Sequence, residues 1–327
     1  MADRISNFPD SILCYVLSFL STKEAVATSV LSKRWNLLWR SVPSLDFVYP
    51  GGDEYVDEVA CFFQSLYSFL LFRDKRQLFH RFRLKCFCFC NDYIFETCIK
   101  AAMRISGRLQ HLDLNLPPVI AVPSVVFSCQ TLVVLKLANL ALKNISFVNF
   151  PLLKILHLNS VTFSEGSDLL QQFLSGSPNL EDLKVKNFSA NAAEKFNRFS
   201  KLVRAEVDSH LVPLENVKNV EVLVLDGVCD FPFARDLGGK VLAYTQPVPT
   251  CISLHLKTCC IKEYSGFVFE FLFAKYIMQN AKYLRTMKVC LNRCSMPYNY
   301  PFFYDVMVSD LSRCIKSSDT CTLLFNI

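Results

Sequence analysis

The chain has 327 residues, of which 52% are hydrophobic and 20% are charged, and its formal net charge is +6. This composition can bury a large core, which excludes intrinsic disorder as the general state of the chain. The length suggests two or three domains or one elongated repeat domain. No apolar run approaches the roughly 18 residues that a membrane span requires. The cationic residues are spread along the chain, and this pattern does not favour nucleic-acid binding.

The 15 cysteines are typical of a reducing compartment, because their number is odd and their spacing is irregular. The N-terminus also lacks the continuous apolar core of a secretory signal, so we expect a cytoplasmic or nuclear protein. Cys86, Cys88 and Cys90 alternate in the sequence, but no C-x-x-C pair is present. We interpret these thiols as buried structural side chains, and we expect no metal and no cofactor.

Residues 4 to 45 have the pattern of three short helices. Pro9 suits the start of the first helix. The apolar residues that follow it at helical spacing form a stripe about 160° wide. They are Ile12, Leu13, Val16, Leu17, Phe19 and Leu20. Residues 21 to 24 have the spacing of a capping box, which predicts a second helix. A third helix is expected to carry Trp35 and Trp39, one turn apart.

The apolar pattern of residues 53 to 106 predicts a helix, a strand and a second helix. Apolar residues recur at helical spacing over residues 53 to 72 and again over residues 92 to 106. Between them, residues 81 to 90 alternate with period two, which is typical of a strand.

From about residue 109 a repeat of the form L-x-x-L-x-L appears. Its central positions are residues 112, 135, 156, 183, 205 and 223, at intervals of 23, 21, 27, 22 and 18 residues. These intervals centre on the 20 to 29 residues of leucine-rich repeats. Each unit supplies one short strand whose leucines face a shared core, and no unit can bury that face alone. The copy at residues 202 to 207 is degraded, and residues 168 to 174 predict a helix between two strands.

A proline-rich stretch at residues 246 to 249 indicates a boundary. Beyond it, the pattern predicts a strand at residues 254 to 256 and a long helix at residues 267 to 279. Two more strands are expected at residues 284 to 289 and 321 to 325.

The N-terminal segment resembles an F-box. The resemblance rests on Phe8-Pro9-Asp10-Ser11-Ile12-Leu13 through Leu20 and on residues 25 to 35, with Phe8 where the family usually has leucine. The run Val30-Leu31-Ser32-Lys33-Arg34-Trp35 and the second tryptophan resemble the plant branch of the family. Residues 273 to 281 and 317 to 321 are similar to the FBD module of plant F-box/LRR proteins.

The resemblance implies an α/β fold in which a three-helix F-box precedes an irregular leucine-rich-repeat solenoid with a C-terminal FBD cap. We expect the F-box at residues 1 to 50 and a helix-strand-helix lead-in at residues 51 to 108. The leucine-rich repeats are expected at residues 109 to 247 and the FBD domain at residues 248 to 327.

The resemblance also implies the substrate-recognition subunit of an SCF-type ubiquitin ligase. The F-box of such a subunit binds a Skp-type adaptor and, through it, a cullin, while the repeat and FBD region holds a protein substrate. Catalysis resides in separate chains, so the protein is expected not to be an enzyme but to supply proximity. The adaptor contacts carried over from the family are Pro9, Ile12, Leu13, Val16 and Leu20.

The residues between the repeat leucines point to the opposite face of each strand. Successive strands stack about 4.8 Å apart and align these positions on one concave sheet. Because the aligned residues mix both charges, we expect a polar, salt-sensitive substrate surface. Its candidate residues are His111, Asp113, Asn115, Lys136, His157, Asn159, Asp182, Lys184, Lys186 and Asp226.

Several alternatives stay open. The helix stripe and the polar strand positions are also compatible with an ordinary core and a solvated face. A non-ligase scaffold would bind the adaptor and recruit nothing for degradation, and a nucleic-acid binder would use the mild basic charge. A Cys-dependent ligase is the main enzymatic alternative, although no local feature marks an activated thiol. No G-x-S-x-G elbow, P-loop or G-x-G-x-x-G motif is present.

Overall fold

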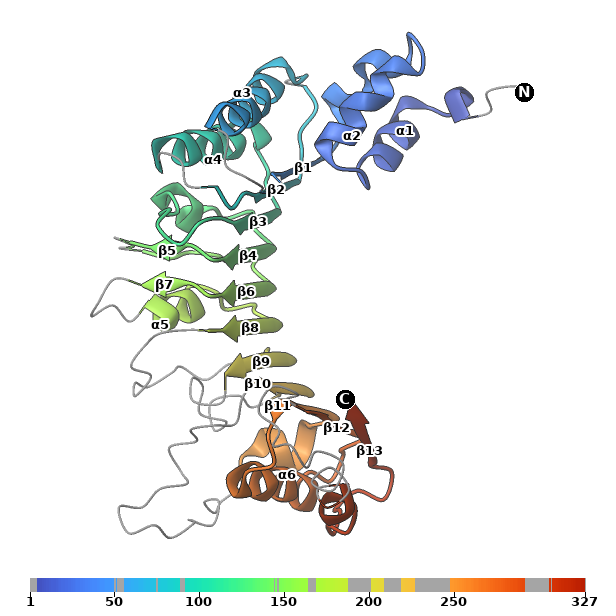
Figure 1. Cartoon of the computed structure of the whole chain (residues 1–327), viewed down its shortest axis with the longest axis vertical. Helices are drawn as coiled ribbons and strands as arrows, with labels where there is room; N and C mark the ends of the chain where they lie inside the picture. Colours follow the sequence, from blue (N-terminus) through green and yellow to red (C-terminus); the bar gives the residue numbers. More distant parts are fainter. Residues whose placement is uncertain are drawn as a thin grey trace. The chain divides into compact units, whose positions relative to one another are not determined.

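The computed structural model divides into two compact units, residues 1–177 and 178–327 (Figure 1). It describes residues 5–49, 51, 56–74, 76–88, 92–143, 145, 147–163, 169–187, 201–208, 219–226, 248–291, 306 and 308–326. Four predicted features lie at least partly outside this set. They are the first residues of the helix expected from residue 53, the end of the strand expected through Cys90, Asp168 in the helix expected from that residue, and the boundary at residues 246 to 247. Among the described helices, none has the length and apolarity needed to cross a bilayer.

The N-terminal segment of unit 1 folds into short helical elements. They are η1 (Ile5–Asn7), α1 (Asp10–Leu17), α2 (Thr22–Ala27), η2 (Thr28–Val30) and η3 (Trp35–Ser41). The expected capping box is present at α2, where the Ser21 hydroxyl accepts the N–H of Glu24 and the Glu24 carboxylate accepts the N–H of Ser21 at 2.9 Å. The third expected helix is a 3₁₀ helix rather than an α-helix.

The F-box segment has its own small core. Its members are Leu13, Cys14, Leu17, Ala25, Trp35, Leu38 and Val42. Leu13 and Leu17 lie one turn apart in α1 and are each 1% exposed. Trp35 of η3 is 7% exposed and belongs to the same core.

Unit 1 continues into a parallel sheet with the order β1-β2-β3-β4-β6. Its strands are β1 (Ser44–Val48), β2 (Arg81–Lys85), β3 (His111–Asn115), β4 (Val134–Ala138) and β6 (Ile155–Asn159). The register aligns Leu45, Phe82, Leu112, Leu135 and Leu156 in one buried row. The sequence pattern predicted three of these strands from the repeat and β2 from its alternation. It missed β1, which follows η3 after a short connection and begins the sheet.

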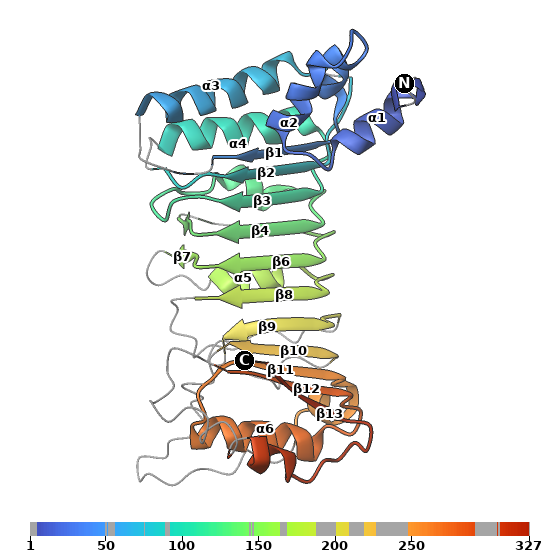
Figure 2. The same ribbon diagram turned by 45° about the vertical axis from the view of Figure 1, so that its right-hand side comes forward.

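Helices cover one face of this sheet. Helices α3 (Val56–Phe72) and α4 (Asp92–Ser106) lie side by side over its first strands (Figures 1 and 2). Phe47 of β1 meets Phe69 of α3 edge to face at 5.5 Å between ring centroids. Phe63 of α3 meets Phe95 of α4 in the same way at 4.9 Å. These contacts attach the strand that leaves the F-box to the helical layer of the repeat region.

The helical layer continues with η4 (Ser124–Ser128) and α5 (Leu169–Ser175), whose rings Phe127 and Phe173 lie 5.6 Å apart. A short parallel pair, β5 (Ala141–Leu142) and β7 (Thr162–Phe163), follows the longer strands β4 and β6. Asn139 and Ser160 stand directly after β4 and β6 with φ of 56° and 52°. Their left-handed backbone turns the chain out of each strand at the same place in the repeat.

Unit 2 contains a second run of parallel strands in the order β8-β9-β10-β11-β12-β13. They are β8 (Asp182–Lys186), β9 (Arg204–Asp208), β10 (Val222–Asp226), β11 (Thr258–Tyr264), β12 (Thr286–Leu291) and β13 (Thr322–Asn326). Leu183, Ala205, Leu223, Cys259, Met287 and Leu323 share one register row. The repeat positions predicted up to residue 223 are therefore confirmed, and the FBD segment adds strands of the same kind.

One strand prediction in unit 2 is wrong. Cys251–His255 forms the π-helical turn η6, and the strand begins later, at Thr258. The N–H of Leu256 donates to the carbonyl of Cys251 at 2.9 Å, which closes the turn. A three-residue apolar alternation is too short to distinguish a strand from a helical turn. The long helix is confirmed as α6 (Val268–Asn280).

Adjacent residues of β4 test the account of the repeat core. Leu135 is 0% exposed in the leucine row, whereas Lys136 lies half-buried on the opposite face. We expect Leu135→Ala to lower the free energy of unfolding by about 2 to 5 kcal/mol, because it leaves a cavity. Lys136→Ala is the matched control and should change it by less than about 0.5 kcal/mol. Equal unfolding midpoints in urea for the two variants would contradict the assignment of faces.

Candidate interaction surfaces

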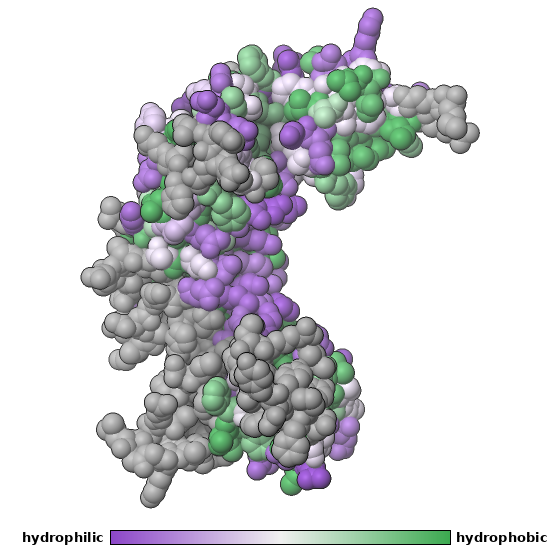
Figure 3. All heavy atoms as spheres, viewed as in Figure 1, coloured by the Kyte–Doolittle hydropathy of each residue, from purple (hydrophilic) through white to green (hydrophobic). Residues whose placement is uncertain are grey.

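The F-box segment leaves an unusual number of large apolar side chains exposed. We call this set the F-box patch; each member is between 37% and 85% exposed. The patch comprises Ile5, Phe8, Ile12, Tyr15, Val16, Phe19, Leu20, Val30, Leu31 and Leu37. Figure 3 shows hydrophobic side chains gathered over the region of α1 and α2. Exposed apolar patches of this kind mark surfaces that a partner covers.

Helix α1 builds the patch by dividing its apolar residues between two faces. Leu13 and Leu17 point into the core, whereas Ile12 and Val16, also one turn apart, are 45% and 50% exposed. Beside them the rings of Tyr15 and Phe19 meet edge to face at 5.0 Å, both on the surface. The stripe that appeared continuous in the sequence therefore serves both the core and the surface.

The predicted adaptor contacts fall on both sides of this division. Pro9, Ile12, Val16 and Leu20 are exposed, and their role in adaptor binding stays a prediction. Leu13 is 1% exposed and packs in the F-box core, so we correct its expected role from contact to packing. Sequence reasoning missed the exposed Phe8, and it treated the two i, i+4 pairs as one stripe because apolar spacing does not say which pair faces the core.

Arg34 fixes the segment that precedes α1. Its guanidinium donates to the Asp10 carboxylate at 2.8 Å and to the backbone carbonyls of Ser6 and Phe8. Next to it, the Trp35 indole N–H donates to the Ser6 hydroxyl at 2.8 Å. An exposed ion pair adds little stability by itself. Its effect here is positional, because these bonds hold one edge of the F-box patch against the helices.

The second candidate surface is the polar face of the strands. All ten predicted substrate-face residues lie half-buried at positions between the leucines, six in unit 1 and four in unit 2. Figure 3 shows hydrophilic side chains along this face of the strands. The structure thus confirms on which side of each strand they stand, and substrate binding itself stays a prediction.

In unit 1 the polar face has one bridging cation. The Arg83 guanidinium lies 3.3 Å from the Asp46 carboxylate and 3.6 Å from the Asp113 carboxylate, so it links three adjacent strands. Near the strand ends, the Asn139 amide donates to the Asn115 side-chain oxygen at 2.9 Å. Asp46 was missed because β1 was not predicted, and Arg83 was missed because the polar face was taken only from the repeats that begin at about residue 109.

In unit 2 a single carboxylate gathers three lysines. Glu206 of β9 is 5% exposed and accepts from Lys262 at 2.7 Å, from Lys184 at 3.1 Å and from Lys186 at 3.2 Å. Burial alone would raise the pKa of Glu206, but the hydrogen bonds and charges of these lysines lower it to about 2. Lys186 also pairs with Asp226.

The Glu206 cluster changes the interpretation of two predicted residues. Lys184 and Lys186 were expected to contact a substrate, but their ammonium groups are engaged in ion pairs between strands. Their first role is to compensate a buried carboxylate. Glu206 itself could have been found by continuing the polar positions through the degraded copy of the repeat at β9.

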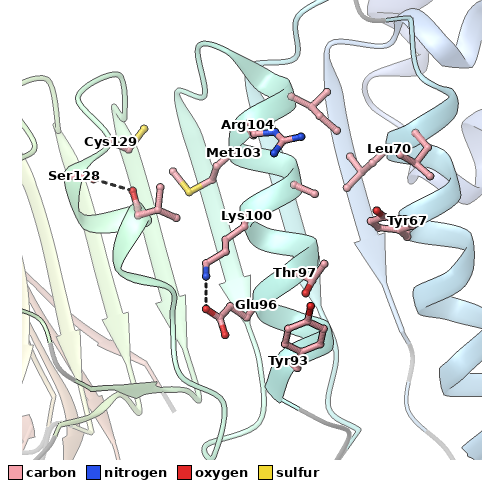
Figure 4. A pocket seen from close by; sticks show the side chains of 14 residues that line it. Tyr67, Leu70, Tyr93, Glu96, Thr97, Lys100, Met103, Arg104, Ser128 and Cys129 are labelled. Carbon is pink, nitrogen blue, oxygen red and sulfur yellow. Dashed lines mark hydrogen bonds and ion pairs between the residues drawn. The ribbon is translucent and has the colours of Figure 1, made fainter.

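A cavity of about 790 Å³ lies on the helical side of unit 1 (Figure 4). Tyr67 and Leu70 of α3, Tyr93 and Arg104 of α4 and Cys129 after η4 are among its lining residues. Inside it Lys100 pairs with Glu96 of the same helix. None of the predicted site residues lines this cavity.

The described residues hold no group of three or more His, Cys, Asp or Glu side chains suited to a metal ion. Cys86 and Cys88 are buried with their sulfurs 2.8 Å apart, just beyond the end of β2. Cys90 lies outside the described residues.

The pH dependence of unfolding tests the Glu206 cluster. The pKa of Glu206 is lowered from its ordinary 4.5 to about 2, so the ionised group stabilises the fold above pH 4.5. This contribution, up to about 3 kcal/mol, is lost as the pH falls from 4.5 through 2. We expect Glu206→Gln to unfold more easily at pH 7 and the difference from wild type to shrink toward pH 2.

A matched control is Glu221→Gln, because Glu221 pairs with Lys257 at 2.7 Å but is 39% exposed. Urea unfolding at several pH values should show little effect of this variant. If both variants follow the wild-type pH profile, the cluster does not stabilise the fold.

Comparison with known protein families gives matches at both ends and in the middle of the chain. The model described as F-box domain matches residues 5–47. The model described as FBD-associated F-box protein At5g56370, LRR repeats matches residues 101–222, and the model described as FBD matches residues 245–289.

Curated relatives come from Arabidopsis thaliana. The F-box/FBD/LRR-repeat protein At1g51370 is 35% identical over 181 residues, which cover 55% of this chain and 40% of the relative. The F-box/LRR-repeat protein At3g59210 is 36% identical over 216 residues, covering 62% of this chain and 43% of the relative. The putative FBD-associated F-box protein At5g53635 is 28% identical over 257 residues, covering 74% and 53%.

The chain thus spans 40% to 53% of the length of these three relatives. The family matches follow the order of the structural elements: the F-box helices, the parallel strands with their leucine rows, and the strands and helix of the C-terminal segment. The chain thus contains segments that match F-box, leucine-rich-repeat and FBD models in that order, and it is similar to F-box/FBD/LRR-repeat proteins of Arabidopsis thaliana.

Proposed function

We propose that this protein is the substrate-recognition subunit of an SCF-type ubiquitin ligase. F-box domains generally bind Skp-type adaptors, and such an adaptor would connect this chain to a cullin. The repeat and FBD segments would hold a protein substrate. The observation that carries the proposal is the F-box patch.

The patch needs a partner for a simple energetic reason. The F-box segment buries seven side chains in its own core but leaves ten large apolar side chains exposed. Covering apolar surface contributes about 25 cal/mol per Å² removed from water. A segment of roughly 40 residues has too little interior to cover this surface itself. A helical adaptor with an apolar groove would provide the missing cover.

Proteins with an F-box and leucine-rich repeats are typically non-catalytic adaptors. A Cys-dependent ligase would need a thiol that deprotonates readily. Burial raises the pKa of Cys98 and Cys251 to about 11, and it raises that of Cys259 further. These environments oppose thiolate formation at Cys98, Cys251 and Cys259.

The adaptor interface can be tested at two exposed positions. We expect the double variant Val16→Asp/Leu20→Asp to lose binding to a purified Skp-type adaptor while keeping its fold. Both residues are exposed, at 50% and 37%, so the fold tolerates the charges, whereas an interface would have to bury them unpaired. That costs several kcal/mol, enough to abolish a micromolar contact. Isothermal titration calorimetry measures the affinity and circular dichroism checks the fold.

The matched control is Leu71→Asp/Phe72→Asp in α3, where the side chains are 53% and 64% exposed but lie outside the F-box patch. It should bind the adaptor like wild type. Normal binding by the Val16/Leu20 variant, or equal loss by both variants, would refute the interface.

Co-purification distinguishes a ligase subunit from a scaffold. A tagged full chain isolated from plant cells is expected to carry both the adaptor and a cullin. Adaptor without cullin would support a non-ligase scaffold, and a ubiquitin thioester on a cysteine of this chain would support the Cys-dependent ligase.

A further inference from the structure

The polar face of unit 1 carries more cations than carboxylates. Its register rows run across β1, β2, β3, β4 and β6 between the leucine positions. Four cationic side chains stand on these rows against two carboxylates. The cations are Arg81, Arg83, Lys85 and Lys136, and the carboxylates are Asp46 and Asp113. Three histidines, His80, His111 and His157, lie on or beside the same rows.

The two carboxylates are already engaged. Arg83 contacts both of them, at 3.3 Å and 3.6 Å. Lys136 stands beside Asp113 in the register, but no ion pair joins it to any described side chain. Arg81 likewise has no ion pair within the described part of the chain, and Lys85 lies over the ring of Phe87 at 5.2 Å. The excess positive charge of this face therefore comes from Arg81, Lys85 and Lys136.

The surroundings of His111 are consistent with this excess. Burial lowers the pKa of His111 first, and the positive charges of Arg81, Lys136 and His80 lower it further. His111 thus stands close to cations contributed by β2 and by β4. An anion placed over these strands would relieve the mutual repulsion.

Unit 2 does not have this excess at its centre. There Lys184, Lys186 and Lys262 converge on the buried Glu206, and Lys186 also pairs with Asp226. The cations of that cluster are compensated within the chain. An anionic partner is therefore attracted more strongly to the polar face of unit 1 than to the Glu206 cluster of unit 2.

The polar rows favour a peptide over a nucleic acid. No Phe, Tyr or Trp stands on the described rows of this face, and the Phe87 ring just beyond β2 is already covered by Lys85, so the rows offer no series of stacking platforms for bases. Asp46 and Asp113 in the middle row would repel a continuous phosphate backbone. Asn115 and Asn159 offer side-chain amides that can bond the main chain of a peptide.

We infer that the polar face of unit 1 binds an acidic segment of the protein substrate, with Arg81, Lys85 and Lys136 as its cationic contacts. This inference rests on the proposed function, since it names the class of substrate that the repeat region holds. Charge complementarity of this kind increases the rate of association and selects the partner.

The test uses the full-length protein and fluorescein-labelled octapeptides of glutamate, glutamine and lysine. Fluorescence anisotropy at low salt should show saturable binding of the glutamate peptide alone, weakened as salt screens the charges. Arg81→Glu/Lys136→Glu should lower the affinity about tenfold or more, because attraction becomes repulsion. Arg104→Glu/Lys143→Glu is the control. It makes the same change in net charge at exposed positions on α4 and after β5, and it should lower the affinity less than about twofold.

The outcomes separate this inference from the proposed function. If the glutamate and glutamine peptides bind equally, or the two charge-reversed variants lose affinity equally, the acidic-segment site is wrong. Tighter binding of a labelled thymidine octanucleotide, lost in the Arg81/Lys136 variant, would assign the face to nucleic acid and also overturn it. Adaptor binding is measured in parallel and should be unchanged by both variants. Its absence in the wild-type protein would refute the proposed function without affecting the peptide result.

Discussion

The stacking of one apolar side chain per strand into a continuous row supports every other feature of this protein. A single five-residue strand cannot bury its leucines, so each strand depends on the register of its neighbour. In unit 1 this row runs from Leu45 to Leu156, with every member 0% exposed. Because side chains alternate along a strand, the same register aligns the intervening residues on the other face. The core and the polar surface are thus two consequences of one constraint.

The F-box enters this arrangement through β1. The strand follows the last turn of the F-box closely, and its Phe47 packs on Phe69 of α3. The backbone N–H of Asp46 also donates to the buried Thr22 hydroxyl of α2 at 2.8 Å, which fixes the strand against the F-box helices. Within unit 1, the surface proposed to bind the adaptor and the sheet proposed to bind substrate are therefore built on one packed body. Such a connection would hold a captured substrate at a defined place relative to the adaptor.

The sequence was informative where periodicity is strong and the segment is long. The leucine positions, the capping box at Ser21 and the helices α3, α4 and α6 all follow from apolar spacing. It was less informative where one short segment serves two purposes. Leu13 and Val16 look alike in a helical stripe, and only tertiary packing sends the first inward and the second outward. Likewise β1 has only five residues, and the turn at Cys251–His255 resembles a strand in its apolar alternation. The Glu206 cluster joins β8, β9 and β11, and it was missed because the polar positions were not continued through the degraded repeat at β9 and into β11.

The central claim is that the F-box patch, and not another surface, receives the adaptor. Hydrogen–deuterium exchange of the full chain with and without a purified Skp-type adaptor tests it most directly. The account predicts slower exchange within residues 8–20 and 30–37 on adaptor binding, with the amides of β3, β4 and β6 unchanged. Slower exchange confined to the strands, or none in the F-box helices of a chain that binds the adaptor, would contradict it.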